Sequence, residues 1–312
     1  MADNALTTFQ PDPGRHDIGP GSTLHERPHP LRWVTGAAVL ALLVLLIYAF
    51  AQGDISWSVV GKNVFTKSIF KGFLNTILLS VLAMLLGIAL GTVFAVMRLS
   101  SNPVTSTVAW LYVWLFRGTP VFLQLLIWFN LALIFPHIHI PGIVDAQTIH
   151  VITPFTAALL GLGINEGSYL TEVIRGGIIS VDHGQSEAAA SVGMSNLRMM
   201  RYVILPQAMP AIIPPIGNEV IGMLKTSALA AAISYAELLT ASQKVYYVNG
   251  RVMELLFVAA IWYLAATSVT SVGQYYLERR FGRSAVRRRS LFDQLMRGAV
   301  QRSRATTSEA SR

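Results

Sequence analysis

Ionisable side chains lie inside two stretches of this sequence that are otherwise apolar enough to enter a lipid bilayer. Glu166 lies in one such stretch, and Glu219 and Lys225 lie in another. A charge in the middle of a bilayer is costly, so it usually lines a polar pathway or pairs with an opposite charge. Both interpretations stay open, because Glu219 and Lys225 are close enough in sequence to pair with each other.

Further polar side chains repeat at helical spacing beside Glu166. Asn165, Tyr169 and Glu172 stand at positions i, i+4 and i+7, which places them on one face of a helix. Arg175 follows Glu172 by three residues, so a purely structural ion pair is the alternative for that glutamate. The candidate pathway residues are Asn165, Glu166, Tyr169, Glu172, Asn218, Glu219 and Lys225.

Composition predicts the kind of element that carries these residues. Hydrophobic residues make up 53% of the 312-residue chain, charged residues only 13%, and mean hydropathy is +0.51. These values indicate an integral membrane protein. The absence of cysteine excludes disulfides and thiolate metal sites. The net charge of +8 does not indicate nucleic-acid binding, because much of it lies in the segment 279–289 directly after a hydrophobic span.

The sequence predicts an all-α membrane bundle of about six crossings. One crossing needs roughly 20 apolar residues, and proline or glycine inside a crossing indicates a helix that faces protein or water. The stretch 104–136 is too long for a single crossing, so we divide it into an interfacial helix near 104–116 and a later span. The expected crossings are 33–51, 72–97, 121–135, 154–176, 207–235 and 255–277.

The division of that long stretch depends on a turn. Thr119 offers an N-cap and Pro120 suits the first position of the helix that follows. The turn consists of Arg117, Gly118, Thr119 and Pro120.

Counting basic residues predicts the orientation. With the N-terminus inside, eighteen arginines, Arg117 among them, fall in the cytoplasm and only five basic residues fall outside. This bias predicts that both termini of a multi-pass membrane protein lie in the cytoplasm. Residues 1–32 are rich in proline and predict a disordered cytoplasmic lead, and 281–312 form a basic cytoplasmic tail. The apolar stretch 33–51 is too long for an ordinary signal peptide, so we expect a retained helix.

A polar loop at residues 184–206, called the coupling loop below, interrupts the apolar pattern. Its alanines favour a short helix, Gly193 allows a sharp turn, and Pro206 is expected to end the unit. A compact cytoplasmic loop of this kind indicates a docking site for a partner. The residues that we single out in it are Gly184, Glu187, Ala188, Ala189, Gly193, Leu205 and Pro206.

The coupling loop resembles the EAA motif of ATP-binding-cassette importer permeases. The family spacing is met by Glu187-Ala188-Ala189, three residues, Gly193, nine residues, Val203, one residue and Leu205-Pro206. Val203 replaces the isoleucine of the family. Segments similar to the polar amino acid permeases for histidine, glutamine and arginine are Arg117-Gly118-Thr119-Pro120, Asn165-Glu166-Gly167-Ser168-Tyr169 and Gly217-Asn218-Glu219.

The resemblance implies an importer-type helical domain over residues 72–280, with 33–51 as an additional first helix. It also implies a dimer with itself or a sister permease, a pair of ATP-hydrolysing subunits that engage the coupling loop, an extracytoplasmic solute-binding protein and a polar amino acid as cargo. The chain has no phosphate-binding loop, so we expect no catalytic residue and no cofactor here, with ATP and Mg²⁺ held by the partner.

The sequence leaves one alternative class of transporter and one candidate metal site. A secondary amino acid transporter driven by an ion gradient would also need charges within the membrane, but it usually has more spans and internal repeats. His137, His139 and His150 imitate a metal cluster, yet a solvated outer loop is the simpler interpretation, and we expect no metal site.

Overall fold

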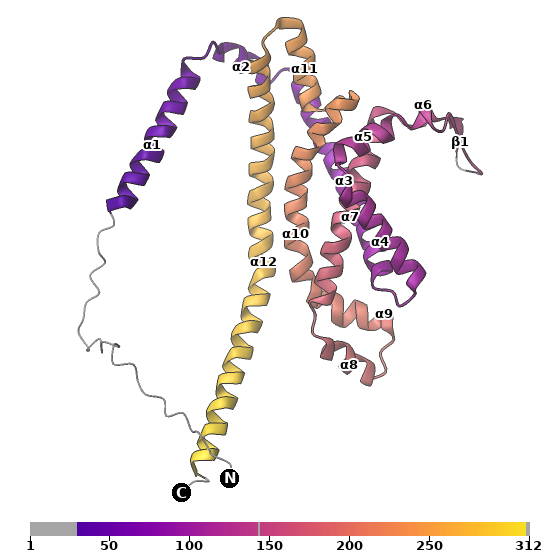
Figure 1. The fold of residues 1–312 in the computed structure, drawn as a ribbon, viewed down its shortest axis with the longest axis vertical. Helices are drawn as coiled ribbons and strands as arrows, with labels where there is room; N and C mark the ends of the chain where they lie inside the picture. Colours follow the sequence, from indigo (N-terminus) through magenta and orange to yellow (C-terminus); the bar gives the residue numbers. More distant parts are fainter. Residues whose placement is uncertain (1–29, 143, 310–312) are drawn as a thin grey trace, which may run out of the picture. The chain divides into compact units, whose positions relative to one another are not determined.

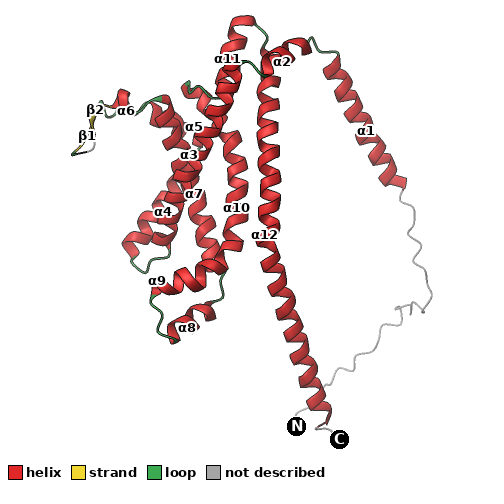
Figure 2. Ribbon diagram, turned by 180° about the vertical axis from the view of Figure 1, so that it is seen from behind, coloured by secondary structure: helices red, strands yellow, loops and turns green. Residues whose placement is uncertain are grey.

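The computed structural model describes residues 30–142 and 144–309 and is helical nearly throughout, as Figure 2 shows. The chain divides into two compact units, residues 1–55 and residues 56–312. The predicted disordered lead, 1–32, lies outside the described residues as far as residue 29.

The helices and strands follow one another along the chain in a simple order (Figure 1). They are α1 (Pro30–Ala51), α2 (Trp57–Val64), α3 (Lys67–Arg98), α4 (Pro103–Gly118), α5 (Val121–Phe129), η1 (Leu131–Leu133), β1 (His137–Ile140), β2 (Val144–Gln147), α6 (Thr148–Val151), α7 (Pro154–Ile179), α8 (His183–Ser191), α9 (Asn196–Met199), η2 (Met200–Ile204), α10 (Leu205–Thr226), η3 (Ser227–Ile233), α11 (Leu238–Asn249) and α12 (Val252–Glu309).

The first unit contains α1, which covers the predicted first span and begins slightly before it. The second unit is built around the packing of α3 against α7. A side chain on Gly91 would meet the Cβ of Leu170 at 2.7 Å and the backbone oxygen of Gly167 at 3.2 Å. One on Gly87 would meet the Cγ of Glu166 at 2.9 Å. The two glycines therefore allow the helix backbones to approach closely.

A second pair of long helices, α10 and α12, lies side by side in both ribbon views (Figures 1 and 2). The buried side chain of Gln274 on α12 donates a hydrogen bond of 2.8 Å to the carbonyl of Pro214 on α10. This bond crosses from one helix to the other at the proline-rich part of α10, where Pro210, Pro214 and Pro215 stand within a continuous helix. The basic tail continues α12 as far as Glu309.

By length and composition, three helices of the described chain are apolar enough to cross a membrane: α1, α3 and the first half of α12. The pair α4 and α5 counts as a fourth if it is one broken span, since its two helices are bent by 101°. Helices α7 and α10 have 26 and 22 residues, long enough for a hydrocarbon core of about 30 Å at about 1.5 Å per residue, but they carry charges. Six crossings remain a prediction.

The predicted third crossing, 121–135, is wrong as a single helix. Helix α5 ends at Phe129, and a short η1 turn and the hairpin of β1 and β2 follow it. The cap predicted at Thr119 is also wrong, because its hydroxyl donates to the carbonyl of Leu115 and so finishes α4. Pro120 occupies the position before α5 and makes no side-chain cap.

The start of α11 is held by a fully buried carboxyl group, that of Glu237. Its oxygens accept hydrogen bonds from the backbone nitrogens of Leu239 at 2.8 Å and Thr240 at 2.6 Å, and from the hydroxyl of Tyr263 at 2.6 Å. The group caps α11 and ties it to α12, so several buried donors depend on one side chain.

Replacing Glu237 with alanine is expected to lower the stability of the purified protein by about 3 kcal/mol, because buried donors lose a charged acceptor. Thermal unfolding in detergent measures this loss as a lower Tm. Glu237→Gln keeps one acceptor oxygen and is expected to lose less. Equal Tm values for Glu237→Ala and the wild-type protein would contradict this role.

Candidate functional site

The coupling loop folds as two short helices joined by a glycine turn. The Asp182 side chain caps α8 by accepting a hydrogen bond of 2.7 Å from the nitrogen of Gly184. At the other end, Gly193 has a φ of +76°, and the nitrogen of Met194 bonds back to the carbonyl of Ala189. This left-handed helix ending favours glycine, as the sequence predicts.

The second half of the loop runs without a break into α10. Helix α9 continues through the π-helical turn η2 into Leu205, whose φ and ψ of −59° and −45° are helical. The expectation that Pro206 ends the unit is therefore wrong. Proline stands in the first turn of α10, where its missing N–H costs little, and the π-helical turn precedes it.

A side-chain hydrogen bond connects the two ends of the coupling loop. The amide of Gln207 on α10 donates to the side-chain oxygen of Gln185 on α8 at 3.2 Å. Helix α8 is thereby attached to the beginning of α10.

The outer surface of the coupling loop carries both charge and apolar groups. Glu187 is exposed, with an oxygen 3.1 Å from Nδ1 of His183. Ala188 and Val192 are also exposed, whereas Ala189 is buried at 5% exposure and does not belong to the outer face. Leu205 remains 38% exposed.

The predicted polar face of α7 meets the turn that ends α4. Nδ2 of Asn165 donates to the carbonyl of Phe116 at 2.7 Å. The guanidinium of Arg117 lies over the ring of Tyr169, 4.8 Å from its centre. The turn and the helical face, predicted separately from the sequence, are therefore parts of one site.

The contact with Tyr169 shows where Arg117 lies along α7. Tyr169 stands ten residues before the last residue of α7, Ile179, which is about 15 Å along the helix axis. Arg117, which was counted as cytoplasmic, lies over the middle of α7. The bias of basic residues toward one side survives without it, as seventeen against five.

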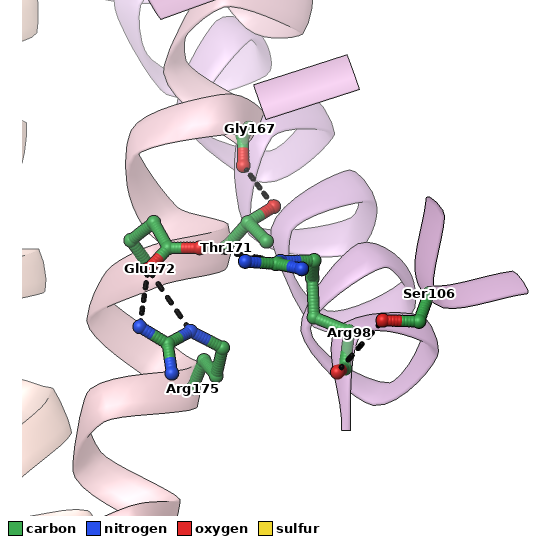
Figure 3. Close-up of polar contacts among 6 residues, drawn as sticks. All are labelled: Arg98, Ser106, Gly167, Thr171, Glu172 and Arg175. Atoms are coloured by element: carbon green, nitrogen blue, oxygen red, sulfur yellow. Dashed lines mark hydrogen bonds and ion pairs between the residues drawn. The ribbon is translucent and has the colours of Figure 1, made fainter. Parts of the chain in front are cut away.

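Glu172, the third residue of that face, forms ion pairs (Figure 3). Its Oε2 accepts hydrogen bonds from Arg175 on the same helix at 2.9 and 2.6 Å. Its Oε1 lies 3.7 Å from Nε of Arg98, the last residue of α3. The structural alternative for Glu172 is therefore observed.

The four remaining pathway candidates are Glu166 on α7 and Asn218, Glu219 and Lys225 on α10. Glu166 is buried at 8% exposure against α3, and its Oε1 has no hydrogen-bond partner. Glu219 on α10 is close enough to interact with it electrostatically. Asn218 and Lys225 are exposed on α10, and no ion pair joins Glu219 to Lys225, both of which the structure describes.

Two residues of the site were missed from the sequence. Arg98 closes the apolar stretch of α3, which is a common place for a basic flank and so gave no signal. Gln124 on α5 is buried, and its amide donates to the carbonyls of Phe116 at 3.0 Å and Thr119 at 3.1 Å. A single glutamine in an otherwise apolar segment was the sequence feature that could have indicated this role. The Gln124 side chain holds the bend between α4 and α5.

Comparisons with known proteins agree with one another. A family model described as "Binding-protein-dependent transport system inner membrane component" matches residues 83–283. The arginine transport system permease protein ArgU of Corynebacterium glutamicum is 43% identical over 280 residues, covering 86% of this chain and 88% of that protein. The glutamine transport system permease protein GlnP of Escherichia coli K12 is 33% identical over 213 residues, covering 68% of this chain and 92% of that protein.

Solved structures give the same result. The structure described as "an amino acid ABC transporter with histidines" is 37% identical with a TM-score of 0.60, covering 69% of this chain and 95% of that one. The family model and the relatives confirm the resemblance seen in the coupling loop and do not support the ion-gradient alternative. This multi-pass inner-membrane chain belongs to the family of binding-protein-dependent transport system inner membrane components, as a permease subunit of an amino acid ATP-binding-cassette importer.

Proposed function

We propose that this permease carries an amino acid with a cationic side chain, L-arginine foremost, and that a separate ATP-hydrolysing subunit drives it through the coupling loop. The cargo is supported by the 43% identity to a permease named for arginine transport, against 33% for one named for glutamine. The carboxyl groups of Glu166 and Glu219 would attract a cationic side chain.

The observation that carries the coupling is the continuity of the loop with α10. Helix α9, the turn η2 and α10 follow one another without a break, and the bond between Gln185 and Gln207 attaches α8 to them. A partner that pushes on α8 would therefore move α10, which bears Asn218, Glu219 and Lys225.

The polar residues of α7 and α10 would line the pathway. Asn165 and Tyr169 stand beside the bend of α4 and α5, while Glu219 stands on the helix attached to the loop. Glu172 would serve mainly to hold α3 and α7 together, because its oxygens already face two arginines.

The assembly that this implies has two permease chains, identical or sister subunits, above two ATP-hydrolysing subunits that bind ATP and Mg²⁺. A solute-binding protein would deliver the cargo from outside. Exposed Glu187 and Val192 would contact the ATP-hydrolysing subunit.

Uptake into proteoliposomes tests the proposal. The permease is reconstituted with the ATP-hydrolysing subunit and the binding protein encoded nearest to it. We expect uptake of radiolabelled L-arginine that requires ATP and both partners and exceeds uptake of L-glutamine. Uptake by the permease alone under an ion gradient would refute the coupling, and a preference for L-glutamine would refute the cargo.

A further inference from the structure

Arg117 occupies an unusual position at the end of α4. The chain turns by 101° between α4 and α5 directly after it, and the turn is held by Asn165 and Gln124. The Arg117 side chain is exposed, and its guanidinium stacks on the ring of Tyr169, which is itself 38% exposed. Stacking fixes the plane of a guanidinium and leaves the N–H groups at its edge directed outward.

No carboxylate of the described chain lies within ion-pair distance of Arg117. Glu172 interacts with it electrostatically, but Oε2 of Glu172 is bonded to Arg175 and its Oε1 lies 3.7 Å from Arg98 (Figure 3). Within the described residues, the guanidinium of Arg117 has no ion pair and no hydrogen bond.

The local charge is therefore unbalanced. We call Arg98, Arg117 and Arg175 the arginine cluster; together they carry three positive charges around the single negative charge of Glu172. An excess of positive charge of this kind attracts an anionic ligand. Nε of Arg98 also lacks a hydrogen bond, but Arg98 and Arg175 both lie within ion-pair distance of Glu172, and Arg117 does not. A guanidinium binds a planar carboxylate through two parallel bonds.

The position of Arg117 along α7 distinguishes two possible anions, a lipid phosphate and a transported solute. Arg117 lies over Tyr169, seven residues or about 10 Å before residue 176, where the expected crossing ends, whereas lipid phosphates lie at the membrane surface. A small solute that passes through the protein reaches this depth.

We propose that Arg117, oriented by Tyr169, binds the α-carboxylate of the amino acid cargo during translocation. The proposal rests on the proposed function and deepens it, since it assigns recognition of the group that all free α-amino acids share. It does not depend on which amino acid is carried, because other residues would recognise the side chain of the cargo.

A pair of ligands that differ only at the carboxylate tests this role. The complex of permease and ATP-hydrolysing subunit is placed in nanodiscs without binding protein, and equilibrium binding of L-arginine and L-argininamide is compared. We expect the wild-type complex to prefer L-arginine by about tenfold, because L-argininamide lacks the carboxylate that would form charge-assisted hydrogen bonds with the guanidinium. In Arg117→Gln the ratio should fall toward one, and Arg117→Lys should be intermediate.

The matched control is Arg251→Gln, which removes an arginine next to Glu254 outside the site and should keep the wild-type ratio. An unchanged ratio in Arg117→Gln would overturn the proposal. If that change also removed bound phosphatidylglycerol from the complex, Arg117 would be assigned to a lipid phosphate. If Arg117→Gln does not fold, the ratio of Arg117→Lys decides, with an unchanged ratio overturning the role.

The outcome is independent of the cargo. Should the full assembly transport L-glutamine rather than L-arginine, the same comparison is made with L-glutamine and L-glutaminamide. A failure of the arginine assignment is then seen in the uptake assay, and a failure of the Arg117 assignment is seen in the ratio.

Discussion

Replacing Gly91 with leucine is expected to separate α3 from α7 and to prevent accumulation of folded permease. A Cβ at this position would lie 2.7 Å from the Cβ of Leu170, 3.1 Å from its backbone carbon and 3.2 Å from the backbone oxygen of Gly167. Two of these three atoms belong to the backbone of α7 and cannot rotate away. The helices must then move apart, which costs at least about 3 kcal/mol, at the upper end of overpacking in a dense interior.

The measurement is the size-exclusion profile and the Tm of the protein in detergent. The matched control is Gly273→Leu in α12, where an added Cβ would have no heavy atom within 4 Å. Both changes replace a glycine by leucine in an apolar helix, so they share the same change in helix propensity. Equal profiles and Tm values for the two variants would show that the contact of α3 with α7 does not limit stability.

Replacing Gly193 with valine is expected to reduce ATP-driven uptake more than tenfold while the protein stays folded. The residue has a φ of +76°, which costs a β-branched side chain about 1–2 kcal/mol or more. The strain would disturb the end of α8 and the position of Glu187 on the outer face of the coupling loop. Because the change lies far from the core of α3 and α7, the Tm should change little.

Uptake in proteoliposomes and co-purification of the ATP-hydrolysing subunit measure this effect. Asparagine tolerates the left-handed conformation, so Gly193→Asn should retain most of the uptake. Wild-type uptake by Gly193→Val would mean that the turn does not transmit the push from the partner, even if the partner binds the loop.

Local patterns were sufficient for much of the fold. The apolar stretches predicted the positions of α1, α3, α7 and the start of α12 within a few residues, because the helix period and the length of a crossing are local properties. The helical face of Asn165, Tyr169 and Glu172 was predictable for the same reason. So was the left-handed turn at Gly193, since glycine best tolerates that conformation.

Other features depended on the conformation of the adjacent segments of the chain. The apolar pattern continues past Phe129, but α5 ends there, and the turn η1 and the hairpin of β1 and β2 follow. Pro206 was expected to end a helix, yet the π-helical turn before it allows α9 to run on into α10. Neither outcome is visible from the preference of a single residue.

The coupling loop and the family resemblance could therefore be predicted from residue spacing alone, because the residues that define them lie close together in the sequence. Which polar residue meets which was decided only by packing. A helical period tells which residues share a face, but it does not tell what that face contacts. Packing of α4 and α3 on α7 therefore separates Glu172, which is held by Arg98 and Arg175, from Arg117, whose donors remain available over Tyr169.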